Sequence, residues 1–338
     1  MTYDVHAHCI PAGVVAALER EGGRYGIEIR ARDGTRVARV AGGSALGPVR
    51  EDLVDVPARL ETMDRTGVDV QLLSGWIGLT GYTLSPEAGA RYARMFNEAL
   101  AETVSEHPER FLGLCYVPLQ APERAAGELR RAVEQLGMVG TEIATTVDGS
   151  DLDDESLEPF WAAAADLRCL VLIHPDQTLP GRRNPRHFLN NTVGNAAETT
   201  IAVGHLICGG VLERYPDLRI CLVHGGGYLP YQAGRLDHGY DAVPGLVGRH
   251  LTRPPSDYLR RLFFDTVTHS PAVLRFLVDF AGADHVVLGS DYPFEMGDPD
   301  PVRTVRGLPG LSEDQRQAIL DGNVRRLLGD VRSPTAHG

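Results

Sequence analysis

The sequence predicts an α/β protein built as one (β/α)8 TIM barrel. Eight short apolar runs of strand length recur along the chain, at residues 2–8, 69–74, 111–118, 140–144, 169–175, 218–226, 262–266 and 285–291. Amphipathic or alanine-rich helical segments lie between them, the clearest at 86–107, 121–136, 156–167 and 195–214. Strands that alternate with helices form parallel sheets, and eight such units close into a barrel of about 250 residues. The chain has 338 residues, which leaves room for insertions.

The surplus length is assigned to insertions within a single domain. We expect residues 1–330 to form one barrel domain and residues 331–338 to form a C-terminal tail. The stretch from about residue 22 to 50 is rich in glycine and arginine, and we expect it to form a small β-hairpin lid. Loops at 176–194 and 240–258, rich in proline, asparagine and arginine, account for the rest.

Composition and charge exclude several function classes. A hydrophobic fraction of 43% is enough for a sizeable core and excludes a disordered chain. The formal net charge of -12 argues against a nucleic-acid partner, because phosphate binding requires a basic surface. There is no run of eighteen apolar residues and no pattern of a secretory signal, so we expect no membrane partner. Five cysteines without a C-x-x-C pair fit a reducing compartment, and we expect a cytoplasmic protein.

The first strand candidate, in "YDVHAHCIP", contains two histidines one residue apart. Side chains alternate along a strand, so His6 and His8 point to the same face, about 6.6 Å apart along the strand, while Ala7 points to the other. The two imidazoles can converge on one metal ion. The alternative is a buried strand that happens to contain two histidines.

Three further reactive residues follow later strand candidates. His174 lies in "VLIHPD", His224 in "CLVHGGG" and Asp291 in "VLGSDYPF". The carboxyl ends of barrel strands meet at one mouth, where barrel enzymes carry their catalytic groups. We therefore expect these three side chains to project toward the same mouth as the two histidines of the first strand.

This set of side chains suits one divalent metal ion. Zinc takes imidazole nitrogen and carboxylate oxygen, and a catalytic zinc site keeps one position open for water. We expect His6, His8, His174 and Asp291 to be the ligands. His224 is then the acid or base that exchanges protons with that water, because imidazole titrates near neutrality. The ligand set suits zinc or manganese, and the paired histidines favour zinc.

The glycines of "HGGGYLPY" allow a tight turn directly after His224. Without a G-x-G-x-x-G spacing or a lysine, this segment is not a phosphate-binding loop. Close approach to a ligand and a purely steric role remain alternative interpretations of the three glycines.

The motifs together resemble those of the amidohydrolase superfamily. They are H-x-H on the first strand, a histidine after the fifth, H-G-G-G after the sixth and G-S-D-Y-P-F after the eighth. More narrowly, the chain resembles the amidohydrolase-2 branch of metal-dependent decarboxylases, typified by 2-amino-3-carboxymuconate 6-semialdehyde decarboxylase. The resemblance covers nearly the whole chain and includes "RLETMDRTGVDVQLLS", "HPERFLGLCYVPLQAPE" and "VVLGSDYPFEMGD".

The resemblance implies roles for particular residues. It implies one divalent metal, usually zinc, held by the four residues named above, with His224 as the catalytic base. Arg235 matches an arginine that reaches the site of a neighbouring subunit, which implies a homodimer; a helix-surface ion pair is the alternative for this residue. The implied reaction is nonoxidative decarboxylation without an organic cofactor, in which His224 and Asp291 transfer protons.

The sequence departs from the resembled family in the pocket. In the semialdehyde decarboxylase an arginine holds a substrate carboxylate, and Gly47 occupies the matching position. Asn191 matches a tryptophan, Asp176 matches an aromatic residue, and two hydroxyls are added by Tyr228 and Tyr231. Loss of a charged clamp costs a substrate on the order of several kcal/mol. We therefore do not expect this protein to act on aminocarboxymuconate semialdehyde.

Three arginines in the loop after the fifth strand are candidates to replace the arginine that binds the substrate carboxylate in the resembled decarboxylase. Arg182, Arg183 and Arg186 lie there, and a solvated basic loop is the alternative for each of them. His269 follows the seventh strand candidate, so its side chain can lie at the edge of the site.

The sequence therefore predicts a metal-dependent nonoxidative decarboxylase of a small aromatic or unsaturated carboxylic acid. A metal-dependent hydrolase of a lactone, an amide or a carbon–carbon bond is the main alternative, because the same metal ligands serve both reactions. A barrel that has lost activity and serves only for binding or assembly is the third.

Overall fold

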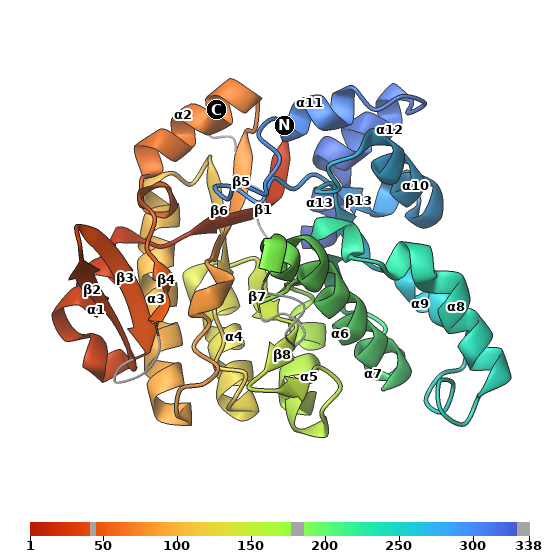
Figure 1. Ribbon diagram of the computed structural model, residues 1–338, viewed down its shortest axis with the longest axis horizontal. Coiled ribbons are helices and arrows are strands. Elements are labelled where there is room, and N and C mark those ends of the chain that lie inside the picture. Colours follow the sequence, from red (N-terminus) through yellow and green to blue (C-terminus); the bar gives the residue numbers. More distant parts are fainter. Residues whose placement is uncertain (41–44, 177–185, 330–338) are drawn as a thin grey trace.

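Eight parallel strands form the central sheet of the computed structural model, which describes residues 1–40, 45–176 and 186–329. Their order in the sheet follows the chain: β1 (Tyr3–Cys9), β5 (Val70–Gly75), β6 (Phe111–Cys115), β7 (Gly140–Ala144), β10 (Leu170–His174), β11 (Arg219–Leu222), β12 (Phe263–Asp265) and β13 (Val286–Val287) (Figure 1). Each of the eight predicted strands is present, and the prediction of a (β/α)8 barrel is confirmed.

The barrel closes through the segment that follows β13. The amide of Val5 donates to the carbonyl of Leu288 at 2.9 Å, and the amide of Asp291 donates to the carbonyl of His6 at 2.8 Å. A parallel bridge joins Ala7 to Tyr292. Asp291 is therefore fixed by backbone hydrogen bonds beside the first strand, although it lies almost 300 residues away in the sequence.

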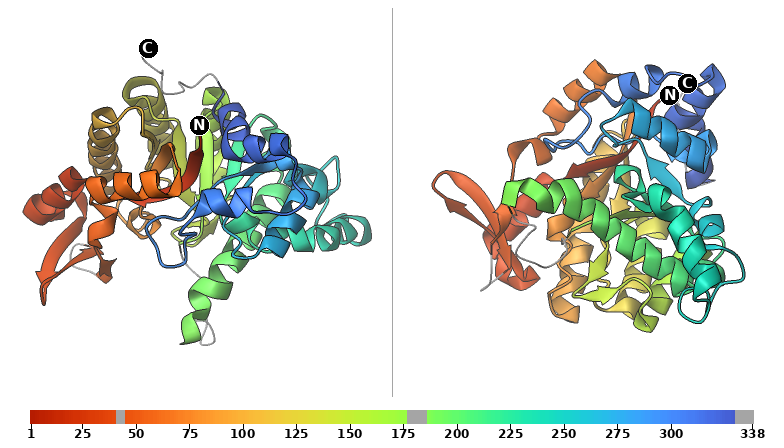
Figure 2. Two further views of the ribbon diagram at one scale, coloured as in Figure 1. Left: turned by 90° about the horizontal axis from the view of Figure 1, so that it is seen from above. Right: turned by 45° about the vertical axis from the view of Figure 1, so that its right-hand side comes forward.

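Helices surround the barrel on the outside (Figures 1 and 2). Their bounds are α1 (Ala12–Tyr25), α2 (Val56–Thr66), α3 (Pro86–Glu106), α4 (Pro122–Leu136), α5 (Glu158–Leu167), α6 (Ala196–Cys208), α7 (Val211–Arg214), α8 (Leu229–Ala242), α9 (Pro255–Leu259), α10 (Pro271–Ala281), α11 (Pro301–Arg306), α12 (Glu313–Gln317) and α13 (Asn323–Leu328). None of the described helices combines the length and the apolar character needed to cross a bilayer.

Buried apolar side chains fill both faces of the sheet. Val171 and Ile173 of β10 share a cluster with Leu129 of α4 and Phe160 of α5, outside the barrel. Leu172 lies between them in the sequence and belongs to a second buried cluster. This alternation along one strand is the pattern expected where helices cover the outer face and side chains fill the interior.

Several helices begin at a capping residue followed by proline. Asp55 accepts from the amide of Ala58 at the start of α2, and Ser270 accepts from the amide of Val273 at the start of α10. A proline in the first turn costs no hydrogen bond, because amides there have no helical partner. Local sequence therefore determines where these helices begin after the loops at the barrel mouth.

The insertion predicted at 22–50 forms a three-stranded antiparallel sheet, where a hairpin was expected. Its strands are β2 (Ile27–Arg32), β3 (Thr35–Val40) and β4 (Ala45–Pro48). The predicted hairpin is correct for the first two strands; the third adds to it because Val37 and Ala38 of β3 also pair with β4. This small sheet lies on the opposite side of the barrel from α8 (Figures 1 and 2). A two-stranded ribbon, β8 (Thr146–Val147) with β9 (Ser150–Asp151), follows β7.

Candidate active site

Four side chains predicted as metal ligands converge at the barrel mouth. His6 and His8 come from β1, His174 is the last residue of β10, and Asp291 follows β13. One ligand atom from each of the four lies within 4.8 Å of the others, and all four residues are buried. The rings of His6 and His8 are 5.0 Å apart between centroids, so both point into the barrel as predicted.

Each histidine is held by its outer ring nitrogen. We assign a proton to Nδ1 of each ring. Nδ1 of His6 donates to Asp265 Oδ2 at 2.7 Å. Nδ1 of His8 donates to the carbonyl of Gly75 at 3.0 Å, and Nδ1 of His174 donates to the carbonyl of Pro175 at 2.8 Å. These partners fix the ring orientations and leave the Nε2 lone pairs facing inward.

The inward-facing atoms fit a divalent cation. Nε2 of His6 and Nε2 of His8 are 3.1 Å apart, and Asp291 Oδ1 lies 3.3 Å from the first and 3.1 Å from the second. Lone pairs that face one another at this distance repel unless a proton or a cation lies between them. Three imidazole nitrogens and one carboxylate oxygen are donors that suit a divalent cation such as zinc or manganese.

The electrostatics of the cluster also favour a cation. Burial opposes the charge on Asp291, but the imidazoles of His6 and His224 outweigh it and hold the pKa of Asp291 well below its usual value. Burial also opposes a charge on His6, yet the carboxylates of Asp291 and Asp265 raise its pKa to about 10. Burial and the neighbouring imidazoles keep the pKa of His174 well below its usual value. The two buried carboxylates thus attract positive charge: without a metal ion they hold an extra proton on His6, whereas His174 stays neutral.

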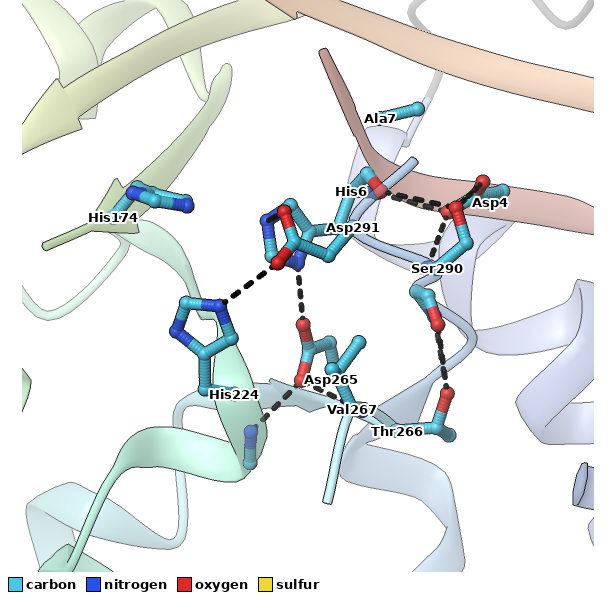
Figure 3. Close-up of polar contacts among 12 residues, drawn as sticks. Asp4, His6, Ala7, His174, His224, Asp265, Thr266, Val267, Ser290 and Asp291 are labelled. Carbon is cyan, nitrogen blue, oxygen red and sulfur yellow. Dashed lines mark hydrogen bonds and ion pairs between the residues drawn. The ribbon is translucent and has the colours of Figure 1, made fainter. Parts of the chain in front are cut away.

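His224 faces the opposite oxygen of the same carboxylate. It begins the short helical turn η6 (His224–Gly226), which is separated from the end of β11 by one residue, and its Nε2 lies 3.5 Å from Asp291 Oδ2. The side chains of His174, His224 and Asp291 surround a common space (Figure 3). His224 is partly exposed, with 19% of its side chain accessible, whereas the proposed ligands are buried. This placement gives an imidazole access to both the carboxylate and a bound substrate.

The glycines after His224 have a steric role. All three have positive φ, and a Cβ on Gly227 would lie 2.3 Å from the carbonyl oxygen of Ala196. The amide of Gly225 donates to Asp265 Oδ1 at 2.8 Å. Asp265 therefore holds His6 through one oxygen and the His224 turn through the other (Figure 3).

A cavity of about 820 Å³ opens onto His224 and Asp291. The predicted pocket residues Asn191, Tyr228, Tyr231 and His269 line it, together with apolar groups from α10 such as Phe276. Among the residues that the structure describes, neither lysine nor arginine lines this cavity. Its wall is largely apolar, with the tyrosine hydroxyls, Asn191 and the histidines among its polar groups, a type of surface that suits a small, mostly apolar ligand.

The remaining predicted pocket residues do not line this cavity. Gly47 lies against the ring of Trp76, and Arg186 is exposed. Asp176 follows His174 by two residues, and burial raises its pKa to about 6. Arg182 and Arg183 lie outside the described residues.

Arg235 lies on α8 (Leu229–Ala242). It is exposed and is not among the residues that line the cavity. Within residues 1–40, 45–176 and 186–329, Arg235 makes no hydrogen bond or ion pair, so the surface ion pair considered as an alternative is not formed there.

Sequence reasoning missed two buried carboxylates beside the proposed ligands. Asp265 is the last residue of β12, and Glu142 lies in β7. The hydroxyl of Ser74, in β5, donates to Glu142 Oε1 at 3.1 Å. Glu142 Oε1 is also 3.6 Å from His8 Nδ1, and burial raises the pKa of Glu142 to about 7. Both residues carried a signal, since each is an acidic residue inside an apolar strand run ("LFFDT" and "GTEIA").

Replacing Asp265 with asparagine is expected to raise the dissociation constant for zinc about 10- to 100-fold, because the hydrogen bond that orients His6 loses its charged acceptor. Competition with a chromophoric chelator measures this change. Asp33→Asn is the matched control, because Asp33 is 95% exposed and lies in the small sheet's turn. Unchanged affinity in Asp265→Asn would show that His6 needs no such partner.

Comparison with known proteins places the chain in a family. The amidohydrolase family model matches residues 3–329. 2-Amino-3-carboxymuconate-6-semialdehyde decarboxylase of Dictyostelium discoideum is 33% identical over 326 residues, which cover 96% of this chain and 91% of that protein. A 2-keto-4-carboxy-3-hexenedioate hydratase of Sphingobium sp. is 30% identical over 255 residues, covering 70% of this chain and 71% of that protein. The chain belongs to the amidohydrolase family.

The solved structures include a close match to the fold. 5-Carboxyvanillate decarboxylase from Sphingomonas paucimobilis superposes with a TM-score of 0.83 at 27% identity, covering 97% of this chain and 98% of that one. The likeness thus extends over the entire barrel, including the β1, β10 and β13 ends that carry the converging side chains.

Proposed function

We propose that this protein is a metal-dependent nonoxidative decarboxylase of a small aromatic or unsaturated carboxylic acid. The observation that carries the proposal is the convergence of His6, His8, His174 and Asp291, with His224 against the free oxygen of Asp291, at the mouth of a cavity. Two of the similar proteins described above are decarboxylases of unsaturated or aromatic acids.

The four converging side chains would hold the cation, and His224 would transfer the proton. A divalent cation in this position supplies a Lewis acid that orients substrate oxygens and lowers the pKa of water. His224 Nε2 carries a proton that it shares with Asp291 Oδ2 through a hydrogen bond. His224 delivers this proton to the substrate carbon that bears the carboxylate. The carbon–carbon bond then breaks, CO2 leaves, and the electron pair of that bond restores the unsaturated system of the product. The net change is replacement of the carboxylate by hydrogen.

Zinc is the proposed ion, with manganese as the second choice. Three imidazole nitrogens and one carboxylate oxygen are the donors that zinc prefers, and manganese accepts the same set less readily.

All five cysteines are free thiols in the structure, and four of them are buried. This state supports our proposal of a reducing, cytoplasmic compartment.

We also propose that the protein acts as a homodimer in which Arg235 enters the partner's site. Arg235 is exposed, and within the described residues it has no hydrogen-bond or ion-pair partner. The cavity has no described lysine or arginine of its own to bind a carboxylate. An arginine from a second copy would supply that charge.

Mixing two inactive variants tests this arrangement. Arg235→Ala and His224→Ala subunits, refolded together in equal amounts, are expected to recover about a quarter of the wild-type activity. Half of the dimers are mixed, and each mixed dimer contains one site with both groups intact. The control is each variant refolded alone. No recovery in mixed dimers confirmed by mass spectrometry would contradict an arginine that acts across the interface.

Addition of water is the second candidate reaction, because one relative described above is a hydratase and the same side chains can activate water. Product masses in water enriched in oxygen-18 separate the two reactions. The proposed decarboxylase forms a product that is lighter than the substrate by CO2 and carries no heavy isotope. A product that has gained labelled oxygen would instead support a hydratase or a hydrolase.

A further inference from the structure

One face of α10 forms an apolar wall of the cavity that opens onto His224 and Asp291. The residues of α10 that line the cavity all carry apolar side chains: Ala272, Val273, Phe276 and Leu277. Residues that are one, four and five positions apart lie on the same side of a helix, because each turn takes about 3.6 residues. This side of α10 therefore faces the cavity as a continuous apolar surface.

A second wall is formed by residues at the start of α8, which packs beside α10 (Figure 1). Tyr228 and Tyr231 line the cavity there. The amide of Tyr228 donates to Thr200 Oγ1 at 2.9 Å, and its hydroxyl donates to the carbonyl of Val193 at 3.3 Å. These two contacts hold Tyr228 against the helical segment that precedes and begins α6, so the second wall is a fixed part of the structure.

Exposure rises from the reacting groups to the α10 wall. Asp291 is buried and 19% of the His224 side chain is accessible, whereas Phe276 is 43% exposed and Val273 is 50% exposed. The carboxylate and the imidazole thus lie deep in the cavity, and the α10 wall lies nearer to solvent. A ligand whose carboxylate reaches His224 would direct its opposite end along this wall.

The cavity is larger than a single carboxylated ring needs. Cavities of about 300–1,000 Å³ enclose drug-sized ligands, and this one has a volume of about 820 Å³. A bare ring acid at His224 would leave Val273 and Phe276 in contact with water. Covering such apolar surface with an apolar part of the ligand is favourable, because it removes apolar area from water on both sides.

We infer, on the basis of the proposed decarboxylase function, that the substrate carries an apolar substituent several carbon atoms long and that Val273 and Phe276 are the specificity-determining residues that bind it. The carboxylate lies at His224, and the substituent extends along α10 toward solvent. The ring of Phe276 packs parallel to that of Phe280, with centroids 6.4 Å apart. This pairing presents a flat surface to an alkyl chain or a second ring. The substrate class is an aromatic or unsaturated acid with an alkyl or aryl substituent.

Binding of benzoate, 3-butylbenzoate and 4-butylbenzoate to the zinc-loaded protein, measured by calorimetry, tests this inference. We expect at least one butyl acid to bind at least about tenfold more tightly than benzoate, because each buried methylene contributes up to about fourfold to affinity. Equal affinity for the three acids would overturn the inference and would indicate that a second copy of the chain covers the α10 wall. Failure of all three to bind would also overturn it.

A double variant tests the two residues of the wall. Val273→Asn/Phe276→Asn is expected to bind benzoate as the wild-type protein does, which also shows that it folds, and to bring the affinities for benzoate and the butyl acids within about threefold of each other. Val243→Asn is the matched control, because Val243 is 45% exposed but is not among the residues that line the cavity. An unchanged preference in the double variant would overturn the role of Val273 and Phe276.

Assays of CO2 release from the same acids separate this inference from the proposed function. Tighter binding of a butyl acid that depends on Val273 and Phe276 would support the substituent site even if no acid released CO2, and the decarboxylase proposal alone would then fail. Release of CO2 with no preference for a butyl acid would support the decarboxylase and overturn the substituent site.

Discussion

Replacing His224 with alanine is expected to lower kcat about 1000-fold while one divalent ion stays bound per chain. Positioned acid–base groups contribute about 10²- to 10⁴-fold to such rates. His224 lies 3.5 Å from Asp291 Oδ2, but it is not among the four residues whose ligand atoms converge within 4.8 Å. Steady-state kinetics with CO2 detection, together with metal analysis of the same sample, measures both quantities.

His269→Ala is the matched control for this variant. His269 also lines the cavity and also has a positive φ, of 55°, but it contacts neither Asp291 nor the histidine cluster in the described structure. We expect its kcat to remain within about threefold of the wild-type value. Full activity in His224→Ala with the metal intact would remove His224 from the proposed proton transfer.

Replacing Asp291 with asparagine is expected to impair both metal binding and turnover. The carboxylate joins the two parts of the site, because Oδ1 faces His6 and His8 while Oδ2 faces His224. Asparagine keeps the shape and removes the charge, so the affinity for zinc should fall by at least about 100-fold. Chelator competition followed by kinetics at saturating zinc measures the two losses separately.

The residual rate at saturating zinc distinguishes the two roles of Asp291. If it only held the metal, saturating zinc would restore kcat. We expect kcat to remain about 1000-fold below the wild-type value, because His224 Nε2 loses its charged partner. Wild-type zinc affinity in Asp291→Asn would exclude Asp291 from the ligand set and contradict the proposed site.

The metal cluster could be predicted from sequence because strand geometry is simple. His6 and His8 share a face by the two-residue period of a strand, and His174 ends a strand that reaches the same mouth. Asp291 required the additional knowledge that the eighth strand closes against the first. In the structure, the hydrogen bond from the amide of Asp291 to the carbonyl of His6 forms part of this closure.

The partners of these side chains could not be predicted in the same way. Asp265 holds both His6 and the amide of Gly225, contacts that depend on how three strands meet in space. The packing of Gly47 on Trp76 depends on where the small three-stranded sheet lies, and residue type alone does not specify that contact. The sequence shows only that Gly47 stands where the resembled decarboxylase has an arginine. The structure adds that the ring of Trp76 occupies the space beside Gly47.

The proposed role of Arg235 depends on the association of two chains. A single chain fixes its position on α8 and its exposure, but its proposed target lies in a second copy. Neither its helical environment nor its burial identifies that target, so Arg235 remains a prediction that the mixing experiment tests.

The most direct test of the account measures ¹³CO2 release from carboxyl-labelled aromatic and unsaturated acids as zinc is added to metal-free protein. We expect release from at least one acid to rise in proportion to bound zinc and to stop rising at one ion per chain, because the described residues form one such cluster, that of His6, His8, His174 and Asp291. One zinc ion bound per chain without ¹³CO2 from any acid would contradict the decarboxylase. Release that is independent of zinc and manganese would contradict the metal site.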